Sequence, residues 1–77
     1  MGWFSRRGSK LPLRQEIELA HLFASFRNDG ENGEDFRVGL FLKYSNRVKA
    51  LREENYDVST HERTVERYVP IFIKQTA

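Results

Sequence analysis

The chain has 77 residues, of which 39% are hydrophobic and 31% are charged, and it contains no cysteine. This length allows one small globular domain with a modest core, in which we expect no deep catalytic cleft. The absence of thiols excludes a disulfide framework and any thiolate metal site. The formal net charge of +2 hides an asymmetry, because residues 1–14 are basic without any acid and the rest of the chain is slightly acidic. Residues 15–77 therefore lack the broad cationic surface of a protein held to DNA mainly by phosphate contacts.

The first residues, MGWFSRRGSKL, combine Gly and Ser with basic side chains, a composition typical of an extended arm. Leu11-Pro12 then marks the start of the ordered domain, because proline is favoured in the first turn of a helix. We therefore divide the chain into a basic, aromatic arm at 1–11 and a single helical domain at 12–77. Two aromatic and three basic residues of the arm are candidate partner-binding residues: Trp3, Phe4, Arg6, Arg7 and Lys10.

Residues 12–27 are predicted to form the first helix. Its apolar side chains recur at helical spacing and spread over neighbouring positions, so the polar strip is narrow. We expect most of this helix to be covered by other elements or by a partner. The spaced residues are Ile17, Ala20, Phe23 and Ala24, and those that widen the arc are Leu19, Leu22 and Phe26.

The next segment, RNDGENGED at 27–35, ends this helix with Gly30 and Gly33 among turn-forming Asn and Asp residues. Interspersed carboxylates are also a feature of calcium loops. This segment, however, lacks the full ligand spacing and the terminal bidentate glutamate of an EF-hand. We interpret it as a solvated acidic loop and expect no metal site.

Residues 36–44 leave two structures open. Apolar residues alternate there as in a half-buried strand, which would pair with 70–75 in an α+β domain with a short two-stranded sheet. A helix over 35–54 accounts for more of the sequence, because an apolar arc of roughly 120° continues after the alternation ends. We therefore predict an all-α, three-helix domain with a basic N-terminal arm. The arc consists of Phe36, Leu40, Tyr44, Val48 and Leu51. Gly39 is a weak point of the predicted helix, because glycine has a low helix propensity.

A third helix is predicted at 60–69. Ser59 and Glu62 fit a capping box, in which the serine side chain accepts from the amide of Glu62 and the glutamate reaches back. Pro70 lacks a backbone donor and disfavours helical angles at Val69, so we expect the helix to kink or stop there and a short extended tail to follow. The apolar face of this helix consists of Val65, Tyr68, Val69 and Phe72.

The stretch VSTHERTVERYV resembles the recognition-helix region of helix-turn-helix DNA-binding domains, in which a Val-Ser turn precedes a helix with an Arg-Thr-Val-x-Arg-Tyr run. The resemblance covers residues 48–72, although the Val-Ser turn lies two residues farther from the Thr-Val pair than is usual and contains no glycine. It implies that exposed residues near the start of the helix face bases and phosphates. Glu62 and Glu66 oppose such an approach, which favours an amphipathic core helix. The candidate nucleic-acid-binding residues are Thr60, His61, Arg63, Thr64 and Arg67.

The sequence offers little for catalysis. Neither His21 nor His61 comes with a recognisable nucleophile, phosphate-binding loop or metal-spaced partner. We therefore expect no enzymatic activity, no catalytic residue and no cofactor. Without a spanning segment or a secretory signal, we also expect a cytoplasmic protein.

The large apolar residues exceed what so small a core can hide, which predicts a regulatory or adaptor protein that docks on a partner protein. Small phage or plasmid accessory proteins are comparable in size and style. The alternative is nucleic-acid binding through the arm and the third helix, with a homodimer reading paired half-sites. Peripheral membrane contact through the arm is a third hypothesis.

Overall fold

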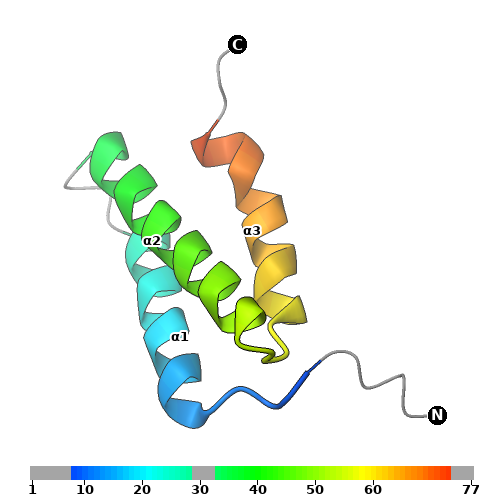
Figure 1. The fold of residues 1–77 in the computed structure, drawn as a ribbon. Helices are drawn as coiled ribbons and strands as arrows, with labels where there is room; N and C mark the ends of the chain where they lie inside the picture. The colour runs from blue at the N-terminus through cyan, green and yellow to red at the C-terminus, as the bar shows by residue number, and fades with distance from the viewer. Residues whose placement is uncertain (1–7, 29–32, 74–77) are drawn as a thin grey trace.

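The computed structural model describes residues 8–28 and 33–73 and consists of three α-helices. They are α1 (Leu13–Asn28), α2 (Glu34–Glu53) and α3 (Ser59–Phe72). Figure 1 shows α1 and α2 side by side in opposite directions, with α3 running back beside α2. The described residues contain no strand, so the all-α prediction is confirmed and the alternative of a two-stranded sheet is wrong. Within these residues, no helix is long and apolar enough to cross a bilayer.

Phe26, near the end of α1, is the centre of the core. Its side chain is fully buried, and it meets its aromatic neighbours edge to face, a geometry favoured by the ring quadrupoles. These neighbours come from all three helices, so one side chain joins the whole bundle. Distances of 5.3–5.6 Å separate the centroid of Phe26 from those of five rings: Phe23, Phe41, Tyr44, Tyr68 and Phe72.

The apolar arc of α1 has two sides, and only one of them faces the core. Leu19 and Phe26 are fully buried, whereas Ile17 is 59% exposed and both Ala20 and Ala24 are exposed. The inward side carries the bulkier residues, and burying it removes more apolar area from water. The evenly spaced residues that suggested a helix therefore lie mainly on its outer face.

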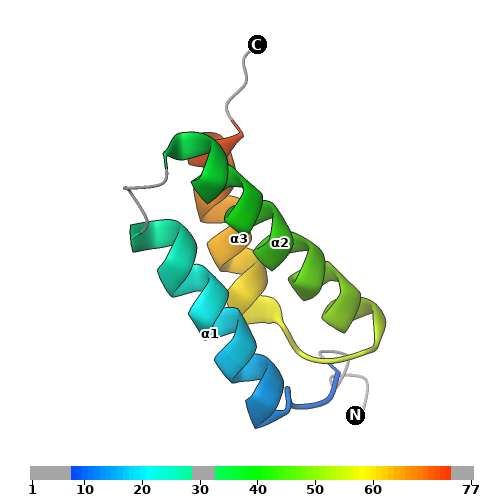
Figure 2. The same ribbon diagram turned by 90° about the vertical axis from the view of Figure 1, so that its left-hand side faces the viewer.

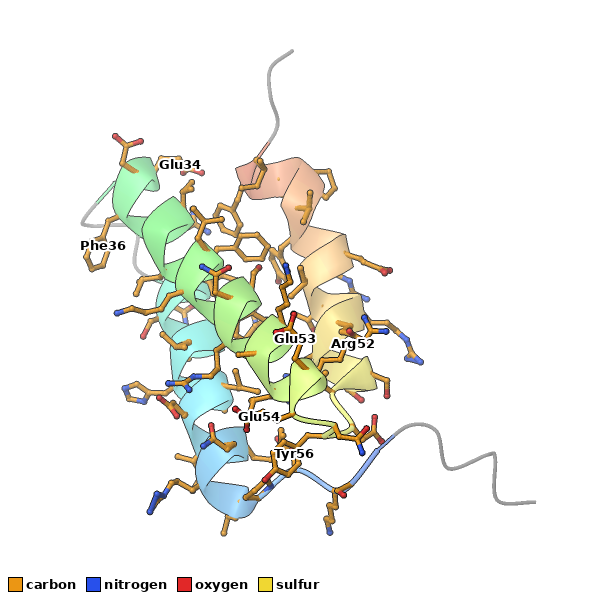
Figure 3. All side chains as sticks on the ribbon, in the orientation of Figure 1. Glu34, Phe36, Arg52, Glu53, Glu54 and Tyr56 are labelled. Carbon is orange, nitrogen blue, oxygen red and sulfur yellow. The ribbon has the colours of Figure 1, made fainter. Side chains whose placement is uncertain are left out.

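α2 is a continuous helix through the segment where the sequence alternates. Tyr44, Val48 and Leu51 are buried as predicted, but Phe36 is 46% exposed and projects from the first turn of α2 (Figure 3). Phe41 takes its place in the core, where it meets aromatic rings of α1 and α3. The inward face is thus rotated toward Phe41 relative to the predicted arc.

α3 begins at Ser59, one residue earlier than predicted, and the predicted capping box is wrong. The amide of Glu62 donates to the carbonyl oxygen of Val58 at 2.8 Å, and the N-cap residue, Val58, makes no side-chain cap. The carboxylate of Asp57 instead accepts from the amide of Ser59 at 3.1 Å and from its hydroxyl at 2.9 Å. The side chain of Glu62 forms an ion pair with Arg52 of α2 at 3.2 Å.

Pro70 lies inside α3 rather than ending it. The helix continues to Phe72, and the amide of Ile73 donates to the carbonyl oxygen of Val69 at 2.7 Å. The expected stop near Val69, with an extended tail from 70 onward, is therefore wrong for residues 70–72, and residues 74–77 lie outside the described part. The alternative expectation, a kink at this point, stays a prediction. Because Phe72 is buried against rings of all three helices, its packing offsets the one hydrogen bond that proline removes.

Residues 8–11 of the predicted arm cross beneath the connection between α2 and α3 (Figure 1). Ser9 forms an isolated parallel bridge with Tyr56. The amide of Ser9 donates to the carbonyl oxygen of Asn55 at 2.9 Å, and the amide of Asp57 donates to the carbonyl oxygen of Ser9 at 2.7 Å. Leu11 then enters the core. The start of the described chain is thereby attached to the end of α2.

This crossing requires a glycine at position 8. Gly8 has a φ of +92°, and a Cβ atom added to it would lie 2.4 Å from the carbonyl oxygen of Asn55. Both the positive φ and the close approach of the two backbones disfavour any other residue. Gly8 therefore permits the contact that Ser9 makes next.

Candidate functional site

The predicted partner-binding arm is described only at its end. Trp3, Phe4, Arg6 and Arg7 lie outside the described residues, so their role stays a prediction. Lys10 is exposed beside the start of α3 and borders an open groove of about 270 Å³. The groove also carries Glu16, Asp57, Ser59 and His61 and thus has more polar than apolar character.

The candidate nucleic-acid-binding residues of α3 do not share one surface. Arg63 and Arg67 are exposed, as is Thr60. The hydroxyl of Thr64 donates to the carbonyl oxygen of Thr60 at 3.2 Å, so it is used within the helix. His61 turns inward and its side chain is only 17% exposed. The side chain of His61 therefore points away from the exposed surface of Arg63 and Arg67 and contacts α1 and α2.

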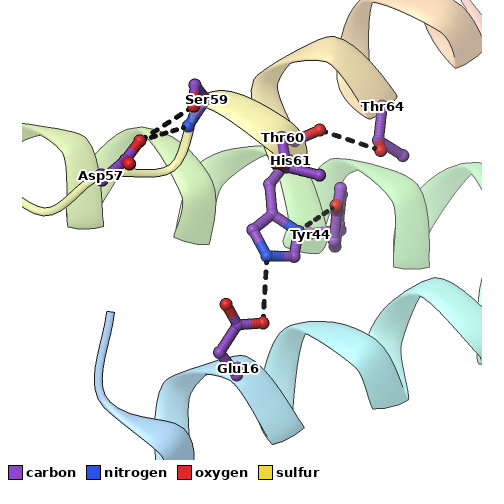
Figure 4. A network of polar contacts seen from close by, with 7 residues as sticks. All are labelled: Glu16, Tyr44, Asp57, Ser59, Thr60, His61 and Thr64. Atoms are coloured by element: carbon purple, nitrogen blue, oxygen red, sulfur yellow. Dashed lines mark hydrogen bonds and ion pairs between the residues drawn. The ribbon is translucent and has the colours of Figure 1, made fainter. Parts of the chain in front are cut away.

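His61 belongs to a polar network that connects the three helices (Figure 4). Its Nε2 lies 3.4 Å from a carboxylate oxygen of Glu16 in α1, and its Nδ1 lies 2.8 Å from the hydroxyl of Tyr44 in α2. A proton on Nε2 satisfies both contacts, since Nε2 then points its hydrogen at the carboxylate and Nδ1 accepts from the tyrosine. The network thus attaches the first turns of α3 to the rest of the bundle.

The hydroxyl of Tyr44 has a shifted pKa. Burial raises the pKa of its hydroxyl above the ordinary value of 10.0, and the negative charge of Glu16 acts in the same direction, while Thr64 opposes it. The phenol therefore stays protonated at neutral pH and remains a donor to His61. This favours a structural role for the tyrosine.

The contacts of the Glu16–Tyr44–His61 network limit the reactions in which His61 could take part. Both nitrogens of His61 are engaged by Glu16 and Tyr44, so neither is directed at a nucleophile. The residues at 8–28 and 33–73 contain no group of three or more side chains placed to hold a metal ion. Part of the acidic loop, residues 29–32, lies outside these ranges. The Glu16–Tyr44–His61 network is therefore better suited to holding the three helices together than to transferring a proton.

The outer face of α1 carries a continuous apolar surface, which we call the α1 stripe: Leu13, Ile17, Ala20 and Ala24. Leu13 is 73% exposed and Ile17 is 59% exposed, and both alanines are exposed as well. Figure 2 shows that α1 lies at the outside of the bundle, with α2 and α3 on one side of it. The stripe extends for about 16 Å along the helix at 1.5 Å per residue. Neighbouring exposed apolar residues of this kind mark interaction surfaces more often than singly scattered ones.

An open groove of about 460 Å³ borders the stripe where α1 meets α2. Ile17 and Leu22 supply its apolar part, and Lys43 and Arg47 of α2 form its basic edge. Arg47 pairs with Glu18 of α1 at 3.2 Å. Apolar surface and positive charge are therefore adjacent on this side of the molecule.

The sequence contained the signal for the α1 stripe without revealing its orientation. Ile17, Ala20 and Ala24 were recognised as evenly spaced, and cover by other elements or by a partner was expected. Nothing in the spacing told which of two apolar sides of α1 would meet the core. No protein-family model, curated protein or solved structure matches this chain. The geometry of α1 and α3 is therefore the basis for the function proposed below.

Proposed function

We propose that this protein is a non-enzymatic docking protein that binds another protein through the α1 stripe. The observation that carries the proposal is the exposure of Leu13 and Ile17 one helical turn apart on an outer face. A helix that packs on one side normally has polar residues on the other, because exposed apolar area contributes nothing to folding. Here the outer face is apolar as well, so a partner that covers it gains binding free energy.

The polar network supports the non-enzymatic part of the proposal. Its histidine is held on both ring nitrogens by Glu16 and Tyr44, so neither nitrogen is directed at a substrate. A regulatory or adaptor role requires only a surface of stable shape. The aromatic core around Phe26 supplies that rigidity behind α1.

Site-specific photo-crosslinking in cells of the native source tests the proposal. A photo-reactive amino acid at Leu13 should give one discrete crosslinked product that contains a second protein, identified by mass spectrometry. The same amino acid at Leu42, an exposed apolar residue of α2 outside the stripe, is the matched control and should not give that product. If Leu13 yields no product, or if both positions yield the same set, the docking role of the stripe is refuted.

Nucleic-acid binding is a second candidate, favoured by the outward position of Arg63 and Arg67 on α3. The carboxylate of Glu62 is held by Arg52, which reduces its repulsion of phosphate. We expect any such binding to weaken steeply with salt and to be weakened further by Arg63→Ala with Arg67→Ala. A gel shift at low salt with mixed DNA and RNA checks this, and absence of any shifted species counts against it.

A further inference from the structure

We propose that the α1 stripe binds an acidic amphipathic helix of another protein, that is, a helix with large aliphatic residues along one side and Asp or Glu beside them. This inference rests on the docking role proposed above and names the chemistry of the partner. Three features of the described residues support it: the spacing of the stripe, the sizes of its side chains, and the charges around it.

The spacing of the stripe fits a helix. Leu13, Ile17, Ala20 and Ala24 follow one another by four, three and four residues. This alternation is the spacing of the apolar seam in coiled coils, where each side chain of one helix enters a hole between four residues of the other. A strand or a loop has no matching repeat. The stripe therefore selects a helical partner over other peptide conformations.

The sizes of the side chains vary along the stripe. Leu13 and Ile17 are large and form its first half, whereas Ala20 and Ala24 are small and form its second half. Small residues let a second helix approach closely or accept a large side chain opposite them. The partner helix should accordingly place its largest aliphatic residues against Ala20 and Ala24.

The charges around the stripe are predominantly positive. Arg14 and Lys43 are exposed, and neither forms an ion pair with another described residue. Of the two carboxylates of α1, Glu18 pairs with Arg47, and Glu16 contacts His61 and borders the groove beside α3 rather than the groove beside the stripe. A helix that lies on the stripe thus meets basic side chains on the groove side. Complementary charge there requires acidic residues on the partner.

A second copy of this chain fits the stripe less well. In an antiparallel pair of α1 helices, Leu13 would lie opposite Ala24 of the other copy, which suits their sizes. The same register would bring Arg14 toward His21 of the other copy. This pair offers no opposite charge across the seam, so a second copy lacks the complementarity that an acidic helix supplies. A parallel pair would place alanine against alanine and leave the seam poorly filled.

Two synthetic three-heptad peptides test the inference. Both carry leucine at alternating three- and four-residue spacing, and they differ only in having glutamate or lysine at the flanking positions. Fluorescence anisotropy with the full chain should show binding of the glutamate peptide and binding of the lysine peptide that is weaker by about ten-fold or more, equivalent to about 1.4 kcal/mol. The double variant Arg14→Glu with Lys43→Glu should reverse this preference.

Ile17→Asp should weaken binding of the glutamate peptide by about ten-fold or more. Ile71→Asp is its matched control, because Ile71 is 53% exposed but belongs to α3, and it should leave binding unchanged. Circular dichroism of every variant establishes that the three helices are intact. A variant that loses its helical signal is replaced by Ile17→Ser, for which a smaller loss of binding in the same direction is expected.

Three results would overturn the inference. Equal binding of the two peptides shows that charge does not select the partner. No binding of either peptide, while Leu13 still crosslinks to a second protein, rejects the acidic helix and leaves the docking role intact. Sedimentation equilibrium that finds a dimer abolished by Ile17→Asp identifies a second copy as the occupant. Failure of crosslinking at Leu13 instead refutes the docking role itself.

Discussion

Replacement of Phe26 by alanine should destabilise this protein more than any other single truncation in its described core. The side chain is fully buried, and its ring contacts five aromatic rings from all three helices. Truncation of a buried phenylalanine costs about 3–5 kcal/mol, from lost transfer free energy and from the cavity that remains. A chain of 77 residues has a total unfolding free energy of roughly 4–12 kcal/mol. The variant is therefore expected to lose about a quarter or more of its stability.

Phe36→Ala is the matched control, because Phe36 is 46% exposed and makes no ring contact with another described residue. Full burial of a phenylalanine contributes about 1.5–3 kcal/mol, so a half-exposed one should contribute about half of that, roughly 0.8–1.5 kcal/mol. Urea unfolding followed by circular dichroism measures both variants. In thermal unfolding, Phe26→Ala should lower Tm by about 12 °C or more. Equal losses in the two variants would refute the central role of Phe26.

Three further predictions concern backbone and hydrogen-bonding features. Gly8→Ala should destabilise the protein by about 1–3 kcal/mol and speed hydrogen exchange at the amides of Ser9 and Asp57. Gly39→Ala, in open space within α2, should instead stabilise the protein by about 0.5–1 kcal/mol. A change in unfolding free energy of the same sign in both variants would contradict the positive-φ argument. Because the pKa of Tyr44 is raised above 10.0, the folded state keeps a proton that the unfolded state releases. The unfolding free energy should thus be unaffected well below pH 10 and fall as pH rises above it; Tyr44→Phe should show a shallower fall in a pH series of urea unfolding, and an identical slope would exclude this origin. Pro70→Ala should raise stability by about 1 kcal/mol or more, because it restores a donor inside α3, and an unchanged urea midpoint would show that the last turn gains nothing from this bond.

The number and approximate bounds of the helices could be predicted from local sequence signals, because these signals agreed with one another. Three helices were expected at 12–27, 35–54 and 60–69, and they are observed at Leu13–Asn28, Glu34–Glu53 and Ser59–Phe72. The alternation at 36–44 could be dismissed because the helical period outlasted it. The agreement is good because helix period, turn residues and charge distribution all act within a few residues of one another.

The errors share a cause that lies outside local sequence. Pro70 disfavours a helix by itself, but the ring of Phe72 packs on rings of all three helices and stabilises the last turn. Ser59 was predicted to cap the helix. The carboxylate of Asp57 instead accepts hydrogen bonds from the amide and the hydroxyl of Ser59, and the helix begins at this serine. In both cases a tertiary or neighbouring contact determines the helix end.

The candidate site was harder to predict than the fold. The spacing of Ile17, Ala20 and Ala24 indicated a helix, but the same spacing fits a buried face and an exposed one equally well. Only the position of α2 and α3 decides between them. Likewise, His61 looked suited to contact a nucleic acid, and its inward direction depends on Glu16 and Tyr44, residues distant in the chain.

The bridge between Ser9 and Tyr56 has a consequence for the order of folding. These residues are 47 positions apart along the chain, so closing this loop costs about 3 kcal/mol of chain entropy if it forms first. The contacts between α1 and α2 span a shorter loop and can form at lower cost. We therefore expect the two long helices to associate early, and the strand-like crossing of residues 8–11 to form after the transition state. Substitutions at Gly8 should then speed unfolding and leave the folding rate almost unchanged.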